Sequence, residues 1–321
     1  MDLLELCALH GNAQVSGGVP AWTLGCFRRR SISFFNGDAD DSSLVLWLQS
    51  RGLTADLRLA TDRPKPTSRE ALADMSLDEL TRLAEAEGGI SPTRFDAAGS
   101  SGVELMGTMQ WQDWTAFQLH AKWPEPGNLR RVGDCLIEHA PSGAYVEDWR
   151  LQPSGDGPLV GLRLLEERDA KSGQLVHRGG GLVVAGEHAI LVRGRAAPLP
   201  PAERLSQLIE RAASEPRLLD AIFGFEASYA RRDGSGRYVV AASTLPWREG
   251  RPLLSLDGFS LEDGQVVQKA REQSRSVERR FRIDTLEPSY EDWIATPATQ
   301  AAVAWLAAEE HTLLRAARRA H

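Results

Sequence analysis

The sequence predicts an all-β protein with inserted helices, built as two antiparallel β-barrels and a C-terminal helix. Short runs rich in β-branched, aromatic or alternating apolar residues recur along the 321 residues, separated by turn-forming segments. The order of strands, proline-rich break, helix and further strands occurs twice. Many short strands with local turns favour a barrel or a sandwich in each half, and a second domain of unrelated fold is the alternative to a repeat.

The first half is predicted to span residues 1–153. Its clearest strand is 53–59, where four apolar residues alternate with Thr54, Asp56 and Arg58. Further strands are expected at 31–35, 44–49, 102–109, 114–119, 135–139 and 145–151. Residues 68–87 predict an inserted helix, in which Ser76 and Glu79 could cap a second segment and which ends at two glycines.

The second half is predicted to span residues 154–321. Its strands are expected at 159–166, 180–184, 188–194, 224–231, 236–243, 253–262, 266–274 and 276–283. A proline-rich break precedes a predicted helix at 202–213, and alanine-rich residues 297–319 predict the C-terminal helix. Because residues 44–64 can be aligned with 182–201, an internal duplication is expected.

The composition limits the partners and the compartment. A net charge of −7 argues against a nucleic-acid partner held by phosphate contacts. Arginines cluster at 28–30, 130–131 and 279–280, and each short cluster is interpreted as a solvated edge. No stretch approaches the roughly 20 apolar residues of a membrane span, and the acidic N-terminus is unlike a signal peptide. Three scattered cysteines favour a reducing, cytoplasmic location.

Several familiar chemistries have no signature in the sequence. It contains no P-loop, no dinucleotide-binding glycine motif and no nucleophile elbow, so no cofactor is demanded. Gly179–Gly181 is expected to form a bulge or turn rather than a phosphate cradle. His120 and His139 could meet inside a barrel with Glu138 or Asp56, but surface or satisfied core histidines are the favoured interpretation, and no metal site is predicted.

Aromatic residues concentrate in the first half and indicate where a ligand would bind. The residues concerned are Trp47, Trp111, Trp114, Trp123, Tyr145 and Trp149. They either fill the barrel core or line a cavity. Asp56 and Arg58, two residues apart on one strand face, are either an exposed pair or a charged pair beside an apolar pocket.

The order of several of these residues resembles a little-characterised bacterial and fungal family of lipocalin-like, double-barrel proteins. The shared patterns are Trp47-Leu48-Gln49, Asp56-Leu57-Arg58 and Arg63-Pro64, then Leu136-Ile137-Glu138 leading to Tyr145, Glu147 and Trp149, and the interval from Trp111 to Phe117-Gln118. The family is distantly similar to a two-barrel yeast protein named for interacting with a casein kinase. The resemblance covers residues 22–150 well and implies two lipocalin-like barrels, without a defined activity.

The chain departs from the family pattern at several polar positions. Gln112 and Asp113 stand where the pattern has His-Arg, and Ser142 stands where it has another histidine. Met109 and Ala116 replace its usual Cys and Asp. If those histidines act in relatives, this chain has lost or changed that function.

Three functions remain open at this point. In the first, the aromatic-lined first barrel binds a small molecule; the expected binding residues are Trp47, Gln49, Asp56, Arg58, Trp111, Trp114, His120, Tyr145 and Trp149. In the second, the same barrel is an isomerase, lyase or cyclase of small-molecule, biosynthetic metabolism; the catalytic candidates are Asp56, Glu138, His139 and Glu147. In the third, solid barrels form a non-catalytic scaffold whose C-terminal helix and sheet edge form a homodimer.

Adjacent positions of one strand limit the second hypothesis. Glu138 and His139 follow each other directly, so their side chains point to opposite faces. Only one of them can face the interior of the barrel, which excludes the pair as a catalytic dyad unless a bulge intervenes.

Overall fold

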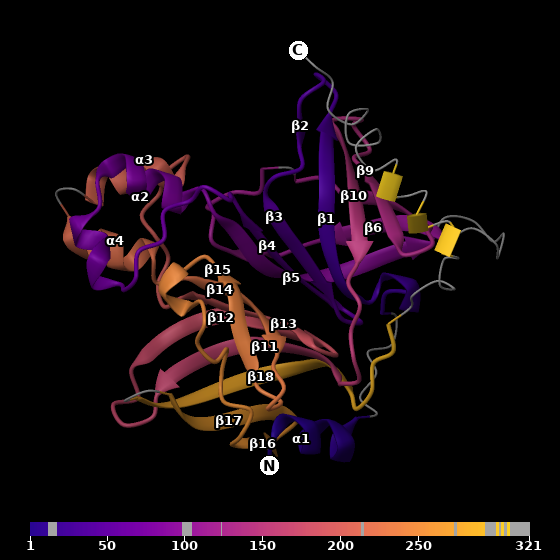
Figure 1. Cartoon of the computed structure of the whole chain (residues 1–321). Coiled ribbons are helices and arrows are strands. Elements are labelled where there is room, and N and C mark those ends of the chain that lie inside the picture. Colours follow the sequence, from indigo (N-terminus) through magenta and orange to yellow (C-terminus); the bar gives the residue numbers. More distant parts are fainter. Residues whose placement is uncertain are drawn as a thin grey trace.

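The computed structural model describes residues 1–11, 18–97, 105–122, 124–212, 215–272 and 275–292, with six further positions between 300 and 308. Most of the predicted helix 297–319, and Trp123, therefore lie outside the described residues. The chain forms two β units that lie one above the other in Figure 1, with a group of helices beside them.

The first unit is a closed antiparallel barrel of eight strands, called the first barrel below. Its strands are β1 (Gly25–Phe34), β3 (Leu44–Gln49), β4 (Leu53–Leu59), β5 (Glu87–Ala97), β6 (Met106–Trp111), β8 (Gly127–Val132), β9 (Cys135–His139) and β10 (Tyr145–Leu151). Pairing between β1 and β10 closes the barrel. The short strands β2 (Ala39–Asp40) and β7 (Thr115–Ala116) pair with β1 and β5.

The second unit is an eight-stranded antiparallel sheet, called the second sheet below. Its strands are β11 (Leu159–Asp169), β12 (Leu175–Ala185), β13 (His188–Arg195), β14 (Glu226–Arg232), β15 (Tyr238–Ser243), β16 (Phe259–Glu262), β17 (Gln265–Glu272) and β18 (Arg275–Glu287). They follow the order β15-β14-β13-β12-β11-β18-β17-β16, and no pairing joins β15 to β16 in the described chain.

The predicted second closed barrel is therefore observed only as an open sheet. After β15 the chain forms the 3₁₀ turn η3 (Pro246–Arg248) and makes an isolated bridge between Val239 and Pro252. Pro246 and Pro252 have no backbone N–H to donate to a ladder, which disfavours regular pairing along this segment.

Three helices pack together at one side of the molecule. They are α2 (Leu77–Ala84), α3 (Leu205–Ala212) and α4 (Pro216–Ile222), and they come from both halves of the chain (Figure 1). The single helix predicted at 68–87 is divided into η2 (Glu70–Asp74) and α2, and the division falls at the capping box of Ser76 and Glu79. Its last predicted residue, Glu87, instead begins β5.

The N-terminal helix α1 (Leu3–His10) was not predicted, and it packs against the second sheet. Leu3, Leu6 and Cys7 are buried in the same apolar cluster as Val160 and Phe281. The N-terminal segment thus contributes to the core of the other β unit, although it falls inside the predicted range 1–153. The short 3₁₀ turn η1 (Ala21–Thr23) then leads into β1.

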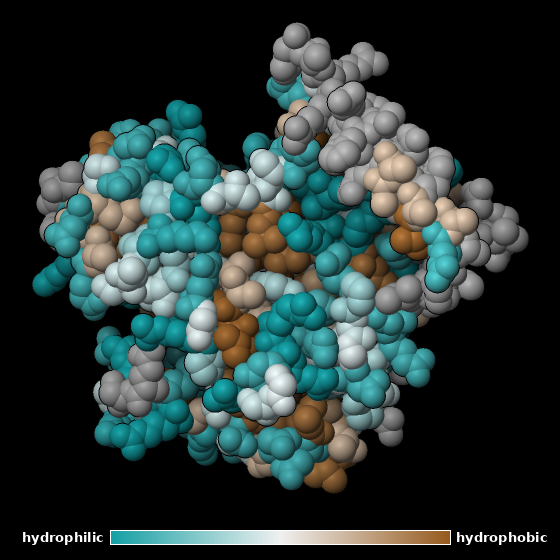
Figure 2. Space-filling model, viewed as in Figure 1, coloured by the Kyte–Doolittle hydropathy of each residue, from teal (hydrophilic) through white to brown (hydrophobic). Residues whose placement is uncertain are grey.

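A large apolar core joins the two β units through their outer faces. Leu46, Leu48 and Leu57 of the first barrel lie in one buried cluster with Val183 and Ile190 of the second sheet. Figure 2 shows a mainly hydrophilic surface with an apolar area in the middle of this face, where the two units meet. β3 and β4 bury their outer faces in this core, and their inner faces point into the first barrel.

Gly179–Gly181 forms the predicted bulge. The pairing of β12 with β13 shifts between His177 and Gly180. Gly179 and Gly180 have positive φ angles, and a Cβ on Gly180 would lie 2.1 Å from the Val192 carbonyl oxygen. The glycines are therefore required by backbone geometry.

Candidate functional site

The first barrel contains a cavity of about 510 Å³. Inward-facing residues of β3, β4, β5, β6, β9 and β10 line it, and the loop around residues 112–126 contributes its mouth. The cavity includes most of the predicted site residues: Trp47, Asp56, Arg58, Trp111, Trp114, His120, Glu138, Tyr145, Glu147 and Trp149. A volume of this size is typical of sites for small organic ligands, which usually measure about 300–1,000 Å³.

Tryptophan rings form one wall of the cavity. Trp47 packs edge-to-face against Trp111 and Trp149, with ring centroids 6.4 and 5.6 Å apart. Phe27 stacks on the other side of Trp47 at 5.1 Å and holds that ring in place. Trp114 is 36% exposed and lines the mouth. The tryptophans therefore both complete the core and present ring surface to the cavity.

Gln49 lies beneath this wall and does not line the cavity, contrary to its predicted binding role. Its Oε1 accepts hydrogen bonds from Trp47 Nε1, at 3.2 Å, and from the Thr54 hydroxyl. Thr54 Oγ1 in turn accepts a hydrogen bond from Trp111 Nε1 at 2.9 Å. Gln49 thus fixes the orientation of two tryptophan rings from a fully buried position.

Arg58 forms the charged centre of the cavity wall. Its guanidinium donates to both Asp56 oxygens, at 2.9 to 3.2 Å, and lies 3.4 Å from Glu147 Oε1. The same guanidinium lies 6.0 Å from the centre of the Trp149 ring, within reach of a cation–π contact. Burial disfavours the charged form, but Asp56 and Glu147 outweigh it and hold the pKa of Arg58 well above its ordinary value.

A bulge in β1 brings a second arginine to the same carboxylate. The pairing of β1 with β10 shifts between Arg29 and Ser31, so that both Arg29 and Ile32 face inward. Arg29 Nη1 donates to Glu147 Oε1 at 2.8 Å, and its Nη2 lies 2.5 Å from Asp40 Oδ2. Glu147 therefore has two cationic partners.

The interpretation of the arginine clusters as solvated edges was wrong for one residue of each. Arg29, Arg131 and Arg279 are 8%, 6% and 1% exposed. Neighbouring side chains on a strand alternate between its faces, so one member of an arginine pair points inward while the next is solvated.

Glu138 is the buried carboxyl group of the cavity. It accepts hydrogen bonds from Trp149 Nε1 at 3.0 Å and from the Tyr145 hydroxyl at 3.2 Å. Burial, and then the adjacent Glu147 carboxylate, raise the pKa of Glu138 to about 8. Both hydrogen-bond donors are neutral, so Glu138 differs from Glu147 in having no cation directly bonded to it.

Neither His120 nor His139 lies inside the first barrel. Glu138 faces the interior, whereas His139 is exposed on the outer face of β9, as the strand parity predicted. His139 therefore cannot act in the cavity. His120 is exposed at the mouth. Within the described chain, no group of three or more metal-ligating side chains is suitably placed for a metal ion.

One residue of the cavity lining and one residue behind it were missed by the sequence prediction. Glu87 faces Arg58 across β4 and β5, but a helix was expected at that position. Arg29, which was assigned to the surface, does not line the cavity itself but contacts the lining residue Glu147. The signal that could have located Glu87 is the Gly-Gly pair after it, because Gly89 allows the backbone of β7 to approach: a Cβ on Gly89 would lie 2.7 Å from the Thr115 carbonyl oxygen.

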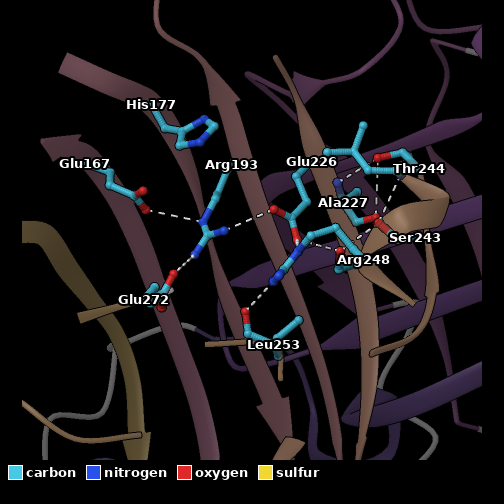
Figure 3. A network of polar contacts seen from close by, with 12 residues as sticks. Glu167, His177, Arg193, Glu226, Ala227, Ser243, Thr244, Arg248, Leu253 and Glu272 are labelled. Atoms are coloured by element: carbon cyan, nitrogen blue, oxygen red, sulfur yellow. Dashed lines mark hydrogen bonds and ion pairs between the residues drawn. The ribbon is translucent and has the colours of Figure 1, made fainter. Parts of the chain in front are cut away.

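The interior of the second sheet holds a second polar cluster, shown in Figure 3. Arg193 lies 3.2 Å from Glu167, 3.0 Å from Glu226 and 3.0 Å from Glu272. Arg248 bonds to the other oxygen of Glu226 at 2.8 Å. Each of these carboxylates forms an ion pair with a guanidinium group of the same cluster. The cluster differs in this from the cavity, where Glu138 has neutral hydrogen-bond donors.

Comparisons with known proteins give one weak structural likeness. The fold is similar to the crystal structure of the uncharacterised protein YLR301w from Saccharomyces cerevisiae, with a TM-score of 0.40 and 10% sequence identity over 79% of this chain and 96% of that chain. No protein-family model matches the sequence. No curated protein matches it either. Within the described residues, no helix is long and apolar enough to cross a membrane.

Proposed function

We propose that the first barrel binds a small, partly apolar organic molecule. The observation that carries this proposal is the cavity of about 510 Å³, walled by tryptophans and containing a few converging polar groups. Apolar and aromatic walls supply most of the binding free energy of such sites, while a small number of polar groups fix the orientation of the ligand.

The inner wall of the cavity is built so that it keeps its shape without a ligand. The Gln49–Thr54 hydrogen bonds orient two tryptophans, and the Asp56–Arg58 pair is anchored by Glu147. A preformed wall lowers the ordering cost of binding, which supports a binding role rather than incomplete packing.

Blocking the cavity tests the proposal. N-phenyl-1-naphthylamine is a neutral aromatic probe whose emission rises when it leaves water. We expect the unmodified chain to raise its emission with micromolar affinity. Ala116→Trp, which adds a bulky ring to the cavity lining, should weaken binding at least tenfold. The matched variant Ala39→Trp, on exposed β2, should bind normally. Equal probe binding by Ala116→Trp and the unmodified chain would refute the proposal, and so would failure of this probe and of all the aromatic compounds named below to bind.

A second candidate function is acid–base catalysis in the same cavity. Glu138 favours it, because a buried acid with a pKa of about 8 can both give and take a proton near neutral pH. Of the predicted catalytic candidates, Asp56 and Glu147 are bonded to arginines and His139 lies outside. Transfer of deuterium from D₂O to carbon atoms of a bound ligand, absent in Glu138→Gln, is the expected result.

We also infer that the two β units arose by duplication of one lipocalin-like unit. Supporting this inference, the strands pair in the same order in both: β6-β5-β4-β3-β1-β10-β9-β8 and β15-β14-β13-β12-β11-β18-β17-β16. The helical insertion also falls at the same place, after the third strand of this topology in each unit. Strand order is independent of residue identity, which is low between the two halves.

A further inference from the structure

The shared strand order allows residues of the two β units to be compared position by position. Arg58 on β4 faces Glu87 on β5, and Arg193 on β13 faces Glu226 on β14. Both arginines point into the interior of their own unit. The two units therefore share an arginine–glutamate position on equivalent strands.

The next pair of strands differs in charge. Glu147 on β10 faces Glu138 on β9, whereas Arg279 on β18 faces Gln268 on β17. Both pairs directly follow a bulge in the neighbouring strand, between Arg29 and Ser31 in β1 and between Leu164 and Glu166 in β11. A pair of carboxyl groups in the first barrel thus corresponds to a guanidinium and an amide in the second sheet.

The buried charges of the second sheet balance one another. Three arginines, Arg193, Arg248 and Arg279, contact the carboxylates of Glu167, Glu226 and Glu272. Figure 3 shows the contacts of Arg193 with all three carboxylates and that of Arg248 with Glu226. Arg279 is 1% exposed and also donates to Gln268 at 2.8 Å. Although burial opposes ionisation, the guanidinium groups lower the pKa of Glu226 and of Glu272 to about 2.

The first barrel lacks this balance. Five acidic residues line its cavity, namely Asp56, Glu87, Glu125, Glu138 and Glu147, against the two basic residues Arg58 and Lys122. Arg29, behind the lining, adds a third positive charge at Glu147. Within the described part of the chain, the Glu138 carboxyl group accepts hydrogen bonds only from the neutral donors of Tyr145 and Trp149. The Glu87 side chain forms no hydrogen bond or ion pair within the described residues, although its charge contributes to raising the pKa of Arg58.

We propose that the ligand of this cavity is an organic cation, with an ammonium or guanidinium group placed against Glu138 and an apolar body against the tryptophans. This inference rests on the proposed binding function and names its ligand class. In the second sheet the Arg279 guanidinium lies 2.8 Å from Gln268, the residue that corresponds to Glu138. In the first barrel the ligand supplies the positive charge at the corresponding place beside Glu138.

The aromatic wall suits the same ligand. The cavity lining around Glu138 includes the rings of Trp47, Trp111 and Trp149, which offer apolar surface to the body of the ligand. An anion would meet an excess of carboxylates, and Arg58 is already occupied by Asp56 and Glu147. The charged groups near Glu138 are Glu147 on β10 and Arg58 on β4, and the neutral, titratable Tyr145 hydroxyl on β10 donates a hydrogen bond to it.

A matched set of probes tests the charge of the ligand. Titration calorimetry with the full chain compares 2-phenylethylamine, 2-phenylethanol and phenylacetate, together with the corresponding naphthyl compounds. We expect each amine to bind at least tenfold more tightly than its alcohol, and each carboxylate to bind most weakly. Amine binding should also release a proton at pH 7, detected as a dependence of the heat on the ionisation enthalpy of the buffer.

Isosteric variants locate the cation. Glu138→Gln should lower amine affinity at least tenfold, leave alcohol affinity within threefold and abolish proton release. Glu87→Gln, on the neighbouring wall, should lower amine affinity about threefold. This variant tests whether the acidic side chains of the cavity attract the cation, even if Glu138→Gln does not fold. Glu210→Gln, exposed on α3, should change nothing.

The outcomes separate the two proposals. Equal or tighter binding of the alcohols or carboxylates would overturn the cation inference and leave a binding function intact. Unchanged amine affinity in both cavity variants would also overturn it. Failure of all six compounds and of the neutral naphthylamine probe to bind would refute the binding function itself.

Discussion

Glu138 offers the most quantitative test of the cavity. Burial and the Glu147 carboxylate place its pKa at about 8 in the folded chain, against an ordinary value of 4.5. Between these pH values the folded state binds a proton that the unfolded state has lost, so this group makes folding less favourable as the pH rises. At about 1.4 kcal/mol for each tenfold change in proton affinity, the full rise corresponds to about 5 kcal/mol.

Glu138→Gln removes this titration while keeping the size of the side chain. Near pH 5 both chains carry a neutral group here, so we expect their free energies of unfolding to agree within about 1 kcal/mol. As the pH rises to 8.5, the variant should become more stable than the unmodified chain, by up to about 5 kcal/mol. Relaxation of the site and entry of water would reduce this difference but would not reverse its sign.

Urea unfolding followed by tryptophan fluorescence, at half-unit steps from pH 5 to 8.5, measures this difference. Glu210→Gln provides the matched control, because the same chemical change on an exposed helix position should give no pH-dependent difference. A difference between Glu138→Gln and the unmodified chain that stays constant with pH would refute the reasoning. A growing advantage for the unmodified chain would show that Glu138 is ionised by a cation that we have not identified.

Three further substitutions test the supporting structure through the free energy of unfolding. Gln49→Leu leaves Trp47 and Thr54 without their buried acceptor and should cost about 3 kcal/mol, whereas exposed Gln174→Leu should stay within about 0.5 kcal/mol. Gly127→Ala places a Cβ 2.7 Å from Glu138 Oε1 and should cost about 1–3 kcal/mol; Gly234→Ala, in open space, is its control. Arg279→Met leaves the buried carboxylates of Glu167 and Glu272 without this cationic partner and should cost about 3–5 kcal/mol. Its control, Arg280→Met at a half-exposed position, should cost less than about 1 kcal/mol.

Strand periodicity made much of the first barrel predictable. Alternation in 53–59 assigned Asp56 and Arg58 to one face, and the structure has them side by side in the cavity lining. The predicted strands 135–139 and 145–151 coincide with β9 and β10. These segments are locally consistent, because their turns, propensities and apolar alternation all indicate the same structure.

The strands that escaped prediction carry residues that disfavour strands. β5 contains Gly88, Gly89 and Pro92, and β8 contains two arginines and an asparagine. In β5 the glycines are required by tertiary contacts: a Cβ on Gly88 would lie 2.8 Å from Ala227 of the second sheet. Contacts between distant segments therefore override local propensity here, and a single sequence does not show them.

The charge of the cavity could not be predicted from the sequence, for a related reason. Whether Glu138 and Glu147 repel, or one of them meets a cation, depends on cross-strand register and on a one-residue bulge that turns Arg29 inward. The second sheet makes the consequence visible, because at the corresponding pair an arginine and a glutamine replace the two acids. The two units thus share a strand order but bury charge differently. In the second sheet the buried carboxylates pair with arginines of the chain, whereas in the first barrel acidic side chains line a cavity. On the proposal made above, this difference makes the first barrel the ligand-binding part of the protein.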